Sequence, residues 1–161
     1  MIEIITQHFP ANIEVVTGHD ACVRIPQKGS YEVLRFLKEN PACDFNMLLD
    51  LCGVDYLSQA EKQGWRFEVV YHLYSLHHGH RLRVRVKMSE EPLAISTVTN
   101  LWKAADWFER EASEMFGFRF EGHENLKPLL LHEGFEGFPL RKDYPIARRQ
   151  KIPLPLERPT S

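Results

Sequence analysis

The chain has 161 residues and a net charge of −2, with 26% charged residues, so it is long enough for one domain with its own hydrophobic core. This balance excludes a strongly basic surface field of the kind that attracts nucleic acid or anionic membranes. No apolar run approaches the roughly 20 residues that span a bilayer, and residues 1–10 lack the pattern of a signal peptide. We therefore expect a cytosolic chain that reaches a membrane only through a partner.

The first 40 residues predict two helices and a hairpin. Apolar residues at helical spacing predict a short helix over residues 2–9. Two β-branched runs, 13–17 and 21–25, are separated by a glycine-containing turn and predict a hairpin. Ser30 is placed to cap a second helix, which Pro41 would end.

Three strands are predicted next. Residues 46–56 are apolar on both faces near their start, which predicts a central strand. Residues 66–75 and 81–87 predict an antiparallel hairpin, joined by a linker that is rich in histidine. In the second strand of this hairpin, leucine and valine alternate with four basic residues, which predicts one core face and one basic, solvated face.

The clearest helix is predicted over residues 106–116. Asp106 and Glu109 have the spacing of a capping box, in which each side chain satisfies a free backbone N–H group at the start of the helix. Gly117 stands where a left-handed residue would end it. The predicted core face consists of Phe108, Ala112, Met115 and Phe116.

On the outer side of this helix, Arg110 and Glu114 lie four residues apart. We expect them to form a surface ion pair worth about 0.2–0.5 kcal/mol. Beyond the helix, Phe118 and Phe120 predict one last short strand.

After residue 122, glycine and proline interrupt every candidate element. Residues 141–161 have six basic and two acidic side chains, a net charge of +4 that leaves −6 on the rest of the chain. A segment of this kind orders only by lying on something else. We predict an α+β fold, with residues 1–122 forming a two-layer domain that has a mixed or antiparallel sheet of about five strands and helices on one face. Residues 123–161 are predicted to form an extended partner-binding segment and tail.

The cysteines and histidines do not predict a metal or redox site. Cys22, Cys43 and Cys52 are far apart, whereas a disulfide framework, a zinc knuckle or a complete iron–sulfur ligand set needs more cysteines or closer ones. We predict buried free thiols in a reducing compartment. The linker histidines lack carboxylate or thiol support, so we favour a solvated loop over a metal site. These histidines are His77, His78 and His80.

The candidate acid–base groups also have simpler structural interpretations. His123 precedes Glu124, but adjacent residues rarely face one another, so we favour structural hydrogen bonding. Glu111 and Glu114 would share a proton only if they were buried together, and an exposed helix end is the simpler interpretation. Cys52 has no sequence sign of an activating base, and no nucleotide-binding fingerprint is present. We predict no catalytic, cofactor-binding or metal site on this chain.

Two segments near the end of the predicted domain carry a family resemblance. EREASEMFGFRFEGH followed by EGFEGFPLRKDYP is similar to the signature of the 30-kDa subunit family of NADH:quinone oxidoreductase, respiratory complex I. FNMLLDLCGVDY resembles the strand of that family that leads into V-D-Y, and AADWFERE resembles its entry to the signature helix. The family usually has Asp, Pro and His where this chain has Glu114, Glu124 and Phe138.

The resemblance implies a non-catalytic peripheral-arm subunit of a proton-translocating NADH:quinone oxidoreductase, a translocase that passes electrons from NADH to quinone. It implies docking against the quinone-site subunit and neighbouring iron–sulfur subunits in a hetero-oligomer. It also implies no cofactor on this chain, with FMN and iron–sulfur clusters on other subunits, and peripheral attachment to the cytoplasmic face of the bacterial inner membrane. The residues expected at the partner interface are Arg110, Glu111, Gly117, His123, Phe138, Arg141, Lys142, Asp143, Tyr144, Arg148 and Arg149.

Other functions remain open at this point. A membrane-bound nickel–iron hydrogenase or a ferredoxin-linked complex has an equivalent subunit with this signature, so partner identity separates the two. A nucleic-acid-binding module would use the basic strand 81–87 and the basic tail, but a pI near 6.4 and the lack of a recognition motif count against it. A stand-alone soluble enzyme is a third interpretation. We expect truncation before Arg141 to leave the domain folded while abolishing assembly, and Arg141→Ala to cost assembly more than stability.

Overall fold

The computed structural model describes residues 2–11, 13–18, 20–88 and 91–150, so residues 151–161 of the predicted tail lie outside it. The element types match an α+β fold. In chain order the elements are α1 (Ile2–His8), β1 (Glu14–Val15), β2 (Cys22–Pro26), α2 (Ser30–Glu39), β3 (Met47–Asp55), the 3₁₀ turn η1 (Leu57–Gln59), α3 (Ala60–Gln63), β4 (Phe67–Tyr74), β5 (Arg81–Met88), β6 (Ala94–Ser96), α4 (Ala105–Phe116) and β7 (Arg119–Glu121). No helix in the described ranges has the length and apolar character needed to cross a bilayer.

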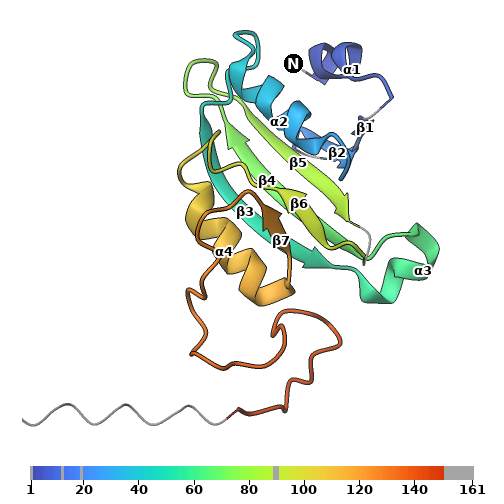
Figure 1. Ribbon diagram of the computed structural model, residues 1–161. Coiled ribbons are helices and arrows are strands. Elements are labelled where there is room, and N and C mark those ends of the chain that lie inside the picture. The colour runs from blue at the N-terminus through green and yellow to red at the C-terminus, as the bar shows by residue number, and fades with distance from the viewer. Residues whose placement is uncertain (1, 12, 19, 89–90, 151–161) are drawn as a thin grey trace, which may run out of the picture.

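The large sheet is mixed and has the strand order β1-β2-β5-β4-β3 (Figure 1). Both predicted hairpins are confirmed, since β1 pairs antiparallel with β2 and β4 pairs antiparallel with β5. β2 and β5 pair in parallel, which makes the sheet mixed. The predicted central position of β3 is wrong, because this strand lies at the edge and pairs only with β4. Its apolar run is covered on one face by α4, while Met47 and Leu49 stay exposed.

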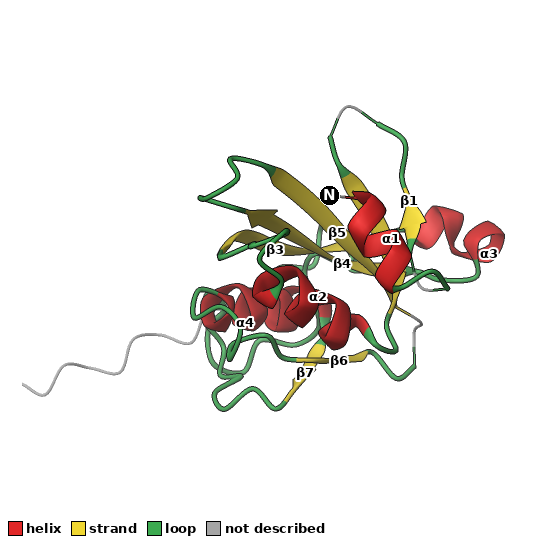
Figure 2. Ribbon diagram, turned by 90° about the horizontal axis from the view of Figure 1, so that it is seen from above, coloured by secondary structure: helices red, strands yellow, loops and turns green. Residues whose placement is uncertain are grey.

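Helices α2 and α4 cover one face of this sheet, and the short parallel pair β6–β7 lies on the same side (Figures 1 and 2). The predicted strand at Phe118 and Phe120 is confirmed as β7, in which Phe120 pairs with Ile95. α1 packs on α2 at one end of the domain, where the ring of His8 stacks on Phe36 at a centroid distance of 4.2 Å. The two-layer arrangement predicted from the sequence is therefore confirmed.

The core lies between the sheet and these two helices. In β5 the buried and half-buried side chains alternate as predicted, and α4 turns its predicted apolar stripe inward except for Phe108, which is partly buried. Each fully buried apolar side chain contributes about 1.5–3 kcal/mol relative to an exposed one. The buried residues of β5 are Leu82, Val84, Val86 and Met88.

The other face of the sheet differs from the expected solvated basic face. Glu68 of β4 has no solvent exposure and accepts hydrogen bonds from Arg24 Nε at 2.7 Å and Arg85 Nε at 2.6 Å. Tyr56 donates its hydroxyl to the same carboxylate at 3.2 Å. The parallel pairing of β2 with β5 sets Arg24 opposite Arg85, so two cations share one buried anion. This pairing joins strands far apart in sequence, which is why the alternation in β5 alone did not predict it.

Both predicted N-terminal caps are wrong, whereas the predicted C-terminal cap is confirmed. α2 is preceded by Gly29 at φ 83°, and Ser30 is buried inside the first turn without a capping hydrogen bond. α4 begins after Ala104, which moves Asp106 inside the helix. Gly117 ends α4 at φ 79°, a conformation that glycine adopts without steric cost. The two missed caps were decided by how the preceding loops enter the core.

Candidate partner interface

Residues 123–150 contain no helix or strand and run past α4 and the end of β3 (Figure 1). Backbone contacts fix part of this path, since Leu140 donates its N–H to the carbonyl of Met115 at 3.2 Å. Lys142 donates its N–H to the Asp55 carboxylate at 2.8 Å. The surface on which the segment lies, between these contacts, belongs to its own domain.

Arg110 and Glu114 hold the segment on α4 instead of pairing with each other as predicted. Arg110 donates to the carbonyls of Lys127 and Pro128 at 3.0 and 3.3 Å. Glu114 accepts three consecutive backbone N–H groups at 2.6–3.3 Å, those of residues 129–131. One cation and one anion a helical turn apart thus serve the acceptors and then the donors of the same stretch of backbone. A stretch without regular structure needs such partners, because its own backbone groups do not pair internally.

Gly117, Phe138 and Arg141 meet at the end of α4. Arg141 Nε donates to the Phe116 carbonyl at 2.6 Å, where a helix C-terminus favours positive charge. Its guanidinium lies 4.3 Å from the centroid of the Phe138 ring and 5.2 Å from that of Phe67. A Cβ at position 117 would lie 2.5 Å from Arg141 Nη2 and 2.7 Å from the Phe138 ring. Glycine is therefore needed here for close approach as well as for its positive φ.

A buried ion network joins the next two residues of the segment to the sheet. The Asp55 carboxylate accepts from Arg66 Nε and Nη2, each at 2.9 Å. Arg66 Nη2 also lies 2.9 Å from the carboxylate of Asp143. Burial raises the pKa of Asp55, but the hydrogen bonds from Arg66 and from the Lys142 N–H outweigh it and hold that pKa below its ordinary value. Asp143 and the Lys142 backbone are thus tied to the domain, while the Lys142 side chain is exposed.

The last part of the described segment is ordered by contacts within itself. Gln150 donates to the Glu136 carbonyl and to the Tyr144 hydroxyl, at 2.7 and 2.9 Å. Arg148 forms an ion pair with Glu136 at 2.8 Å and lies over the Tyr144 ring. These contacts close residues 136–150 into a compact loop.

The histidines predicted as structural groups do contact the backbone. The His123 side chain is 1% exposed, and its Nδ1 accepts the Asn125 N–H at 3.0 Å while its Nε2 lies 3.2 Å from the Asp106 carboxylate. His78 and His80 contact the carbonyls of Pro41 and Cys43 at 2.9 and 3.0 Å. In the linker, these contacts replace the solvated loop that the sequence predicted.

Glu109 is a buried carboxyl that the sequence pattern placed at a helix cap. It has no solvent exposure and accepts hydrogen bonds from the Thr97 hydroxyl and the Val98 N–H at 2.5 and 2.7 Å. Burial raises the pKa of Glu109 to about 7, and the two hydrogen bonds offset only part of this effect. The domain therefore folds with this carboxyl largely protonated in mildly acidic solution.

Glu109→Gln should change how stability depends on pH. The folded protein binds more protons than the unfolded chain between the ordinary pKa of 4.5 and about 7, so the free energy of unfolding falls as pH rises through this window. Glutamine can make the same two hydrogen bonds without ionising. We expect the variant to gain about 2–3 kcal/mol relative to the parent between pH 4.5 and pH 8, measured by urea unfolding. Glu111→Gln, an exposed position on the same helix, controls for the change in net charge. Parallel pH profiles of the parent and Glu109→Gln would contradict the assignment.

The structure divides the eleven predicted interface residues into two groups. Most shape the segment through contacts inside the chain, while Glu111 and Arg149 are exposed. The residues with intramolecular contacts are Arg110, Gly117, His123, Phe138, Arg141, Lys142, Asp143, Tyr144 and Arg148. Sequence reasoning missed the structural roles of Asp55, Arg66 and Glu114. Their common signal is a charged residue beside a glycine-rich or proline-rich segment that lacks its own backbone partners.

Apolar side chains remain exposed along α4 and the segment. Trp107 is 57% exposed, with Arg110 placed 5.0 Å from its ring centroid, and Ile146 is fully exposed. Leu130 and Leu140 are more than half exposed. A backbone that is fixed by many contacts thus presents large apolar side chains to the outside.

A protein-family model described as "Respiratory-chain NADH dehydrogenase, 30 Kd subunit" matches residues 23–150. The chain belongs to this family. The matched range begins in β2 and includes every contact that holds the segment on the 30-kDa subunit fold. The resemblance drawn from the two signature segments is therefore confirmed.

Proteins named as the C subunit of NADH-quinone oxidoreductase are the relatives of this family member. The C subunit of Maricaulis maris (strain MCS10) is 52% identical over 131 residues, which are 81% of this chain and 63% of that protein. The C subunit numbered 2 of Rhizobium meliloti (strain 1021) is 48% identical over 122 residues, 76% of this chain and 64% of that protein. The chain spans less than two thirds of the length of these two relatives.

Two solved structures share the fold of this family member. The trypsin-resistant fragment (1-134) of Nqo5 is 36% identical with a TM-score of 0.67, and the match covers 77% of this chain and 98% of the fragment. A chain of the membrane-bound sulfane sulfur reductase, an archaeal respiratory membrane complex, is 24% identical with a TM-score of 0.74, over 91% of this chain and 84% of that one. At this identity the second likeness shows the fold alone.

Proposed function

We propose that this chain is a non-catalytic peripheral-arm subunit of a proton-translocating NADH:quinone oxidoreductase. It supports electron transfer from NADH to quinone by docking against the quinone-site subunit and its iron–sulfur neighbours. The family match over residues 23–150 carries this proposal. In this function the chain holds no cofactor, FMN and iron–sulfur clusters lie on other subunits, and the hetero-oligomer attaches it to the cytoplasmic face of the bacterial inner membrane.

In this proposal residues 1–122 form the folded domain and residues 123–161 form the partner-binding segment. The contacts made by Arg110, Glu114 and Arg141 support this division, because they fix the segment's path before a partner arrives. A preformed path reduces the ordering entropy that an extended segment loses on binding.

The exposed apolar side chains form the centre of the proposed docking surface, and charged side chains form its rim. Trp107, Leu130 and Ile146 are the apolar members that are exposed by more than half of their surface and lie on α4 or the segment. Glu111, Lys142 and Arg149 are exposed charges near them in sequence. Interfaces have this composition, with an apolar centre and a polar rim.

Arg141 acts in this proposal by shaping the surface from within. Its hydrogen bond to the Phe116 carbonyl and its contact with Phe138 position residues 138–141. We therefore expect Arg141→Ala to lower both monomer stability and assembly, instead of assembly alone. Truncation before Arg141 would also remove the Lys142 N–H that Asp55 accepts, so the cut must fall after Tyr144 to spare the domain.

The double variant Leu130→Glu/Ile146→Glu should abolish assembly and leave the isolated chain folded. Both side chains are exposed and contribute little to the domain's core, while two buried carboxylates at an interface are costly. The measurement is recovery of partner subunits with a tagged chain expressed in its native host, after gentle solubilisation, by mass spectrometry. The matched control is Leu76→Glu, a position 65% exposed in the β4–β5 loop, at the end of the sheet away from the segment (Figure 1).

The identity of the partners tests the function itself. Recovery with a quinone-site subunit, iron–sulfur subunits and an NADH-oxidising flavoprotein is the expected result. Recovery with a nickel–iron large subunit would replace the proposal with the hydrogenase alternative. Recovery with nucleic acid, or of the chain alone, would overturn it.

A further inference from the structure

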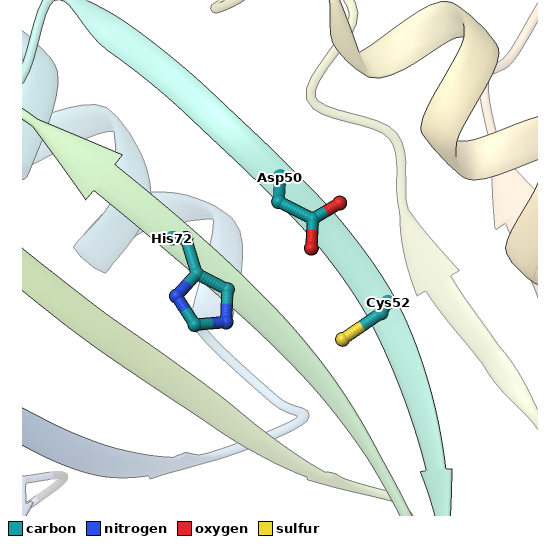
Figure 3. A group of neighbouring side chains, drawn as sticks. All are labelled: Asp50, Cys52 and His72. Carbon is teal, nitrogen blue, oxygen red and sulfur yellow. The ribbon is translucent and has the colours of Figure 1, made fainter.

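Three side chains with metal-binding atoms meet on the face of the sheet opposite α2 and α4. Asp50 and Cys52 lie two residues apart in β3 and therefore point to the same side, and His72 of β4 is the direct cross-strand partner of Asp50. Figure 3 shows the carboxylate, the thiol and the imidazole converging over these two strands. One ligand atom from each lies within 4.8 Å of the other two. All three side chains are half-buried, and no other such group occurs within the described ranges.

A β-bulge brings Asp50 to this face. The register of β3 against β4 shifts between Leu48 and Asp50, so one extra residue, Leu49, is inserted into β3. Leu48 and Leu51 are both buried on the core side, and regular alternation from Leu48 would turn residue 50 inward as well. The bulge reverses this and places Asp50 on the same side as Cys52. Bulges that redirect one side chain are typical of binding sites.

We propose that Asp50, Cys52 and His72 form a binding site for one borderline divalent transition-metal ion such as Zn²⁺. One nitrogen, one sulfur and one carboxylate oxygen suit this class of ion, whereas Mg²⁺ and Ca²⁺ require oxygen ligands. Three protein ligands leave a fourth position open to water or to a partner's side chain. Tetrahedral bonds of 2.0–2.3 Å would bring the ligand atoms to about 3.3–3.8 Å from one another, so side-chain rotations close the site without movement of the strands.

The protonation states match metal uptake. Burial and the neighbouring Arg83 lower the pKa of His72, which keeps the imidazole in the neutral form that binds metals. Burial and the Asp50 carboxylate raise the pKa of Cys52, so the free thiol is protonated. Binding then replaces the thiol proton by a metal–sulfur bond and releases that proton to solvent. Arg83 is the nearby cation that opposes binding, and its guanidinium donates to Asp20 at 3.1 Å.

The test is titration of the full 161-residue chain with Co²⁺ and Zn²⁺ under reducing conditions. Co²⁺ bound by a thiolate gives a near-ultraviolet charge-transfer band, which reports cysteine ligation directly, and calorimetry with Zn²⁺ gives the stoichiometry. We expect one ion per chain, loss of the band in Cys52→Ser, and at least a roughly tenfold rise in the Zn²⁺ dissociation constant in His72→Gln and Asp50→Asn. Zn²⁺ binding should also release a proton, seen as a dependence of the binding heat on the buffer.

Two control variants keep the proposal falsifiable. Cys22→Ala removes another thiol on the same sheet, and His78→Asn removes a histidine from the β4–β5 linker, so both should keep the band and the affinity. Circular dichroism of each metal-free variant checks that the fold is intact. No saturable uptake, a band that survives Cys52→Ser, or binding lost in His78→Asn instead of His72→Gln would overturn the proposal. None of these results depends on the proposed function in the respiratory complex.

Discussion

Replacement of Asp55 by alanine is expected to lower the free energy of unfolding by about 3–5 kcal/mol, the loss usual when one partner of a buried ion pair is removed. The Arg66 side chain is 9% exposed, and it would keep its charge without the carboxylate that accepts two of its N–H groups. The backbone N–H groups of Leu57 and Lys142 would lose the same acceptor. The variant should therefore loosen both the end of β3 and the start of residues 142–144.

Asp143→Ala is the matched control for Asp55→Ala, because both carboxylates contact Arg66 Nη2 at 2.9 Å. The Asp143 side chain is half exposed, so water screens this pair and we expect a loss below about 1 kcal/mol. Denaturant unfolding at neutral pH measures both variants. The advantage of the parent over Asp55→Ala should shrink as pH falls below the ordinary carboxyl range, since the lowered pKa of Asp55 stabilises the fold only while that group is ionised. Equal losses in the two variants would contradict a special role for the buried carboxylate.

Gly53→Ala is expected to lower the free energy of unfolding by about 1–3 kcal/mol, through overpacking of the core. A Cβ at position 53 would lie 2.5 Å from Cδ2 of Phe116, and 2.7 Å from Cε2 of both Phe116 and Phe118. These two rings stack at a centroid distance of 5.5 Å, and Phe118 is 1% exposed, so neither ring has free space into which it could move. The substitution should push α4 away from β3 and disturb the end of the helix on which the segment lies.

Two comparisons test this mechanism. Gly18→Ala, at a glycine with no atom within 4 Å of the added Cβ and no positive φ, should change stability by no more than about 0.5 kcal/mol. Phe116→Leu introduced into Gly53→Ala removes ring atoms from the point of contact and should recover part of the lost stability, as a positive coupling in a double-mutant cycle. Additive losses in the double variant would show that the clash with Phe116 is not the cause.

Features set by neighbouring residues were predicted well. The alternation of residues 81–87, the i, i+4, i+7 apolar stripe of α4 and the glycine at its C-terminus are local patterns, and each is confirmed. The family membership is confirmed for the same reason, because the signature of residues 109–123 and 133–145 is carried by the order of residues alone.

The errors concern charged residues whose partners lie far away in sequence. Glu109 was assigned to a helix cap three residues from Asp106, but its partners are Thr97 and Val98 in the turn after β6. Arg110 and Glu114 were assigned to each other because i, i+4 spacing is the only relation visible in a sequence. Their partners are backbone groups 15–18 residues further along the chain.

The sequence by itself determined the types of most elements, the two hairpins, the irregular character of residues 123–150 and the family. Only the tertiary structure decided that β2 pairs in parallel with β5, that β3 lies at the edge, and that Asp50, Cys52 and His72 share one face. The physical reason is that helix and hairpin patterns depend on residues a few positions apart, whereas strand order, bulges and buried ion networks depend on contacts across tens of residues. A charged side chain in particular shows its sign in the sequence, and burial then decides which partner it must have.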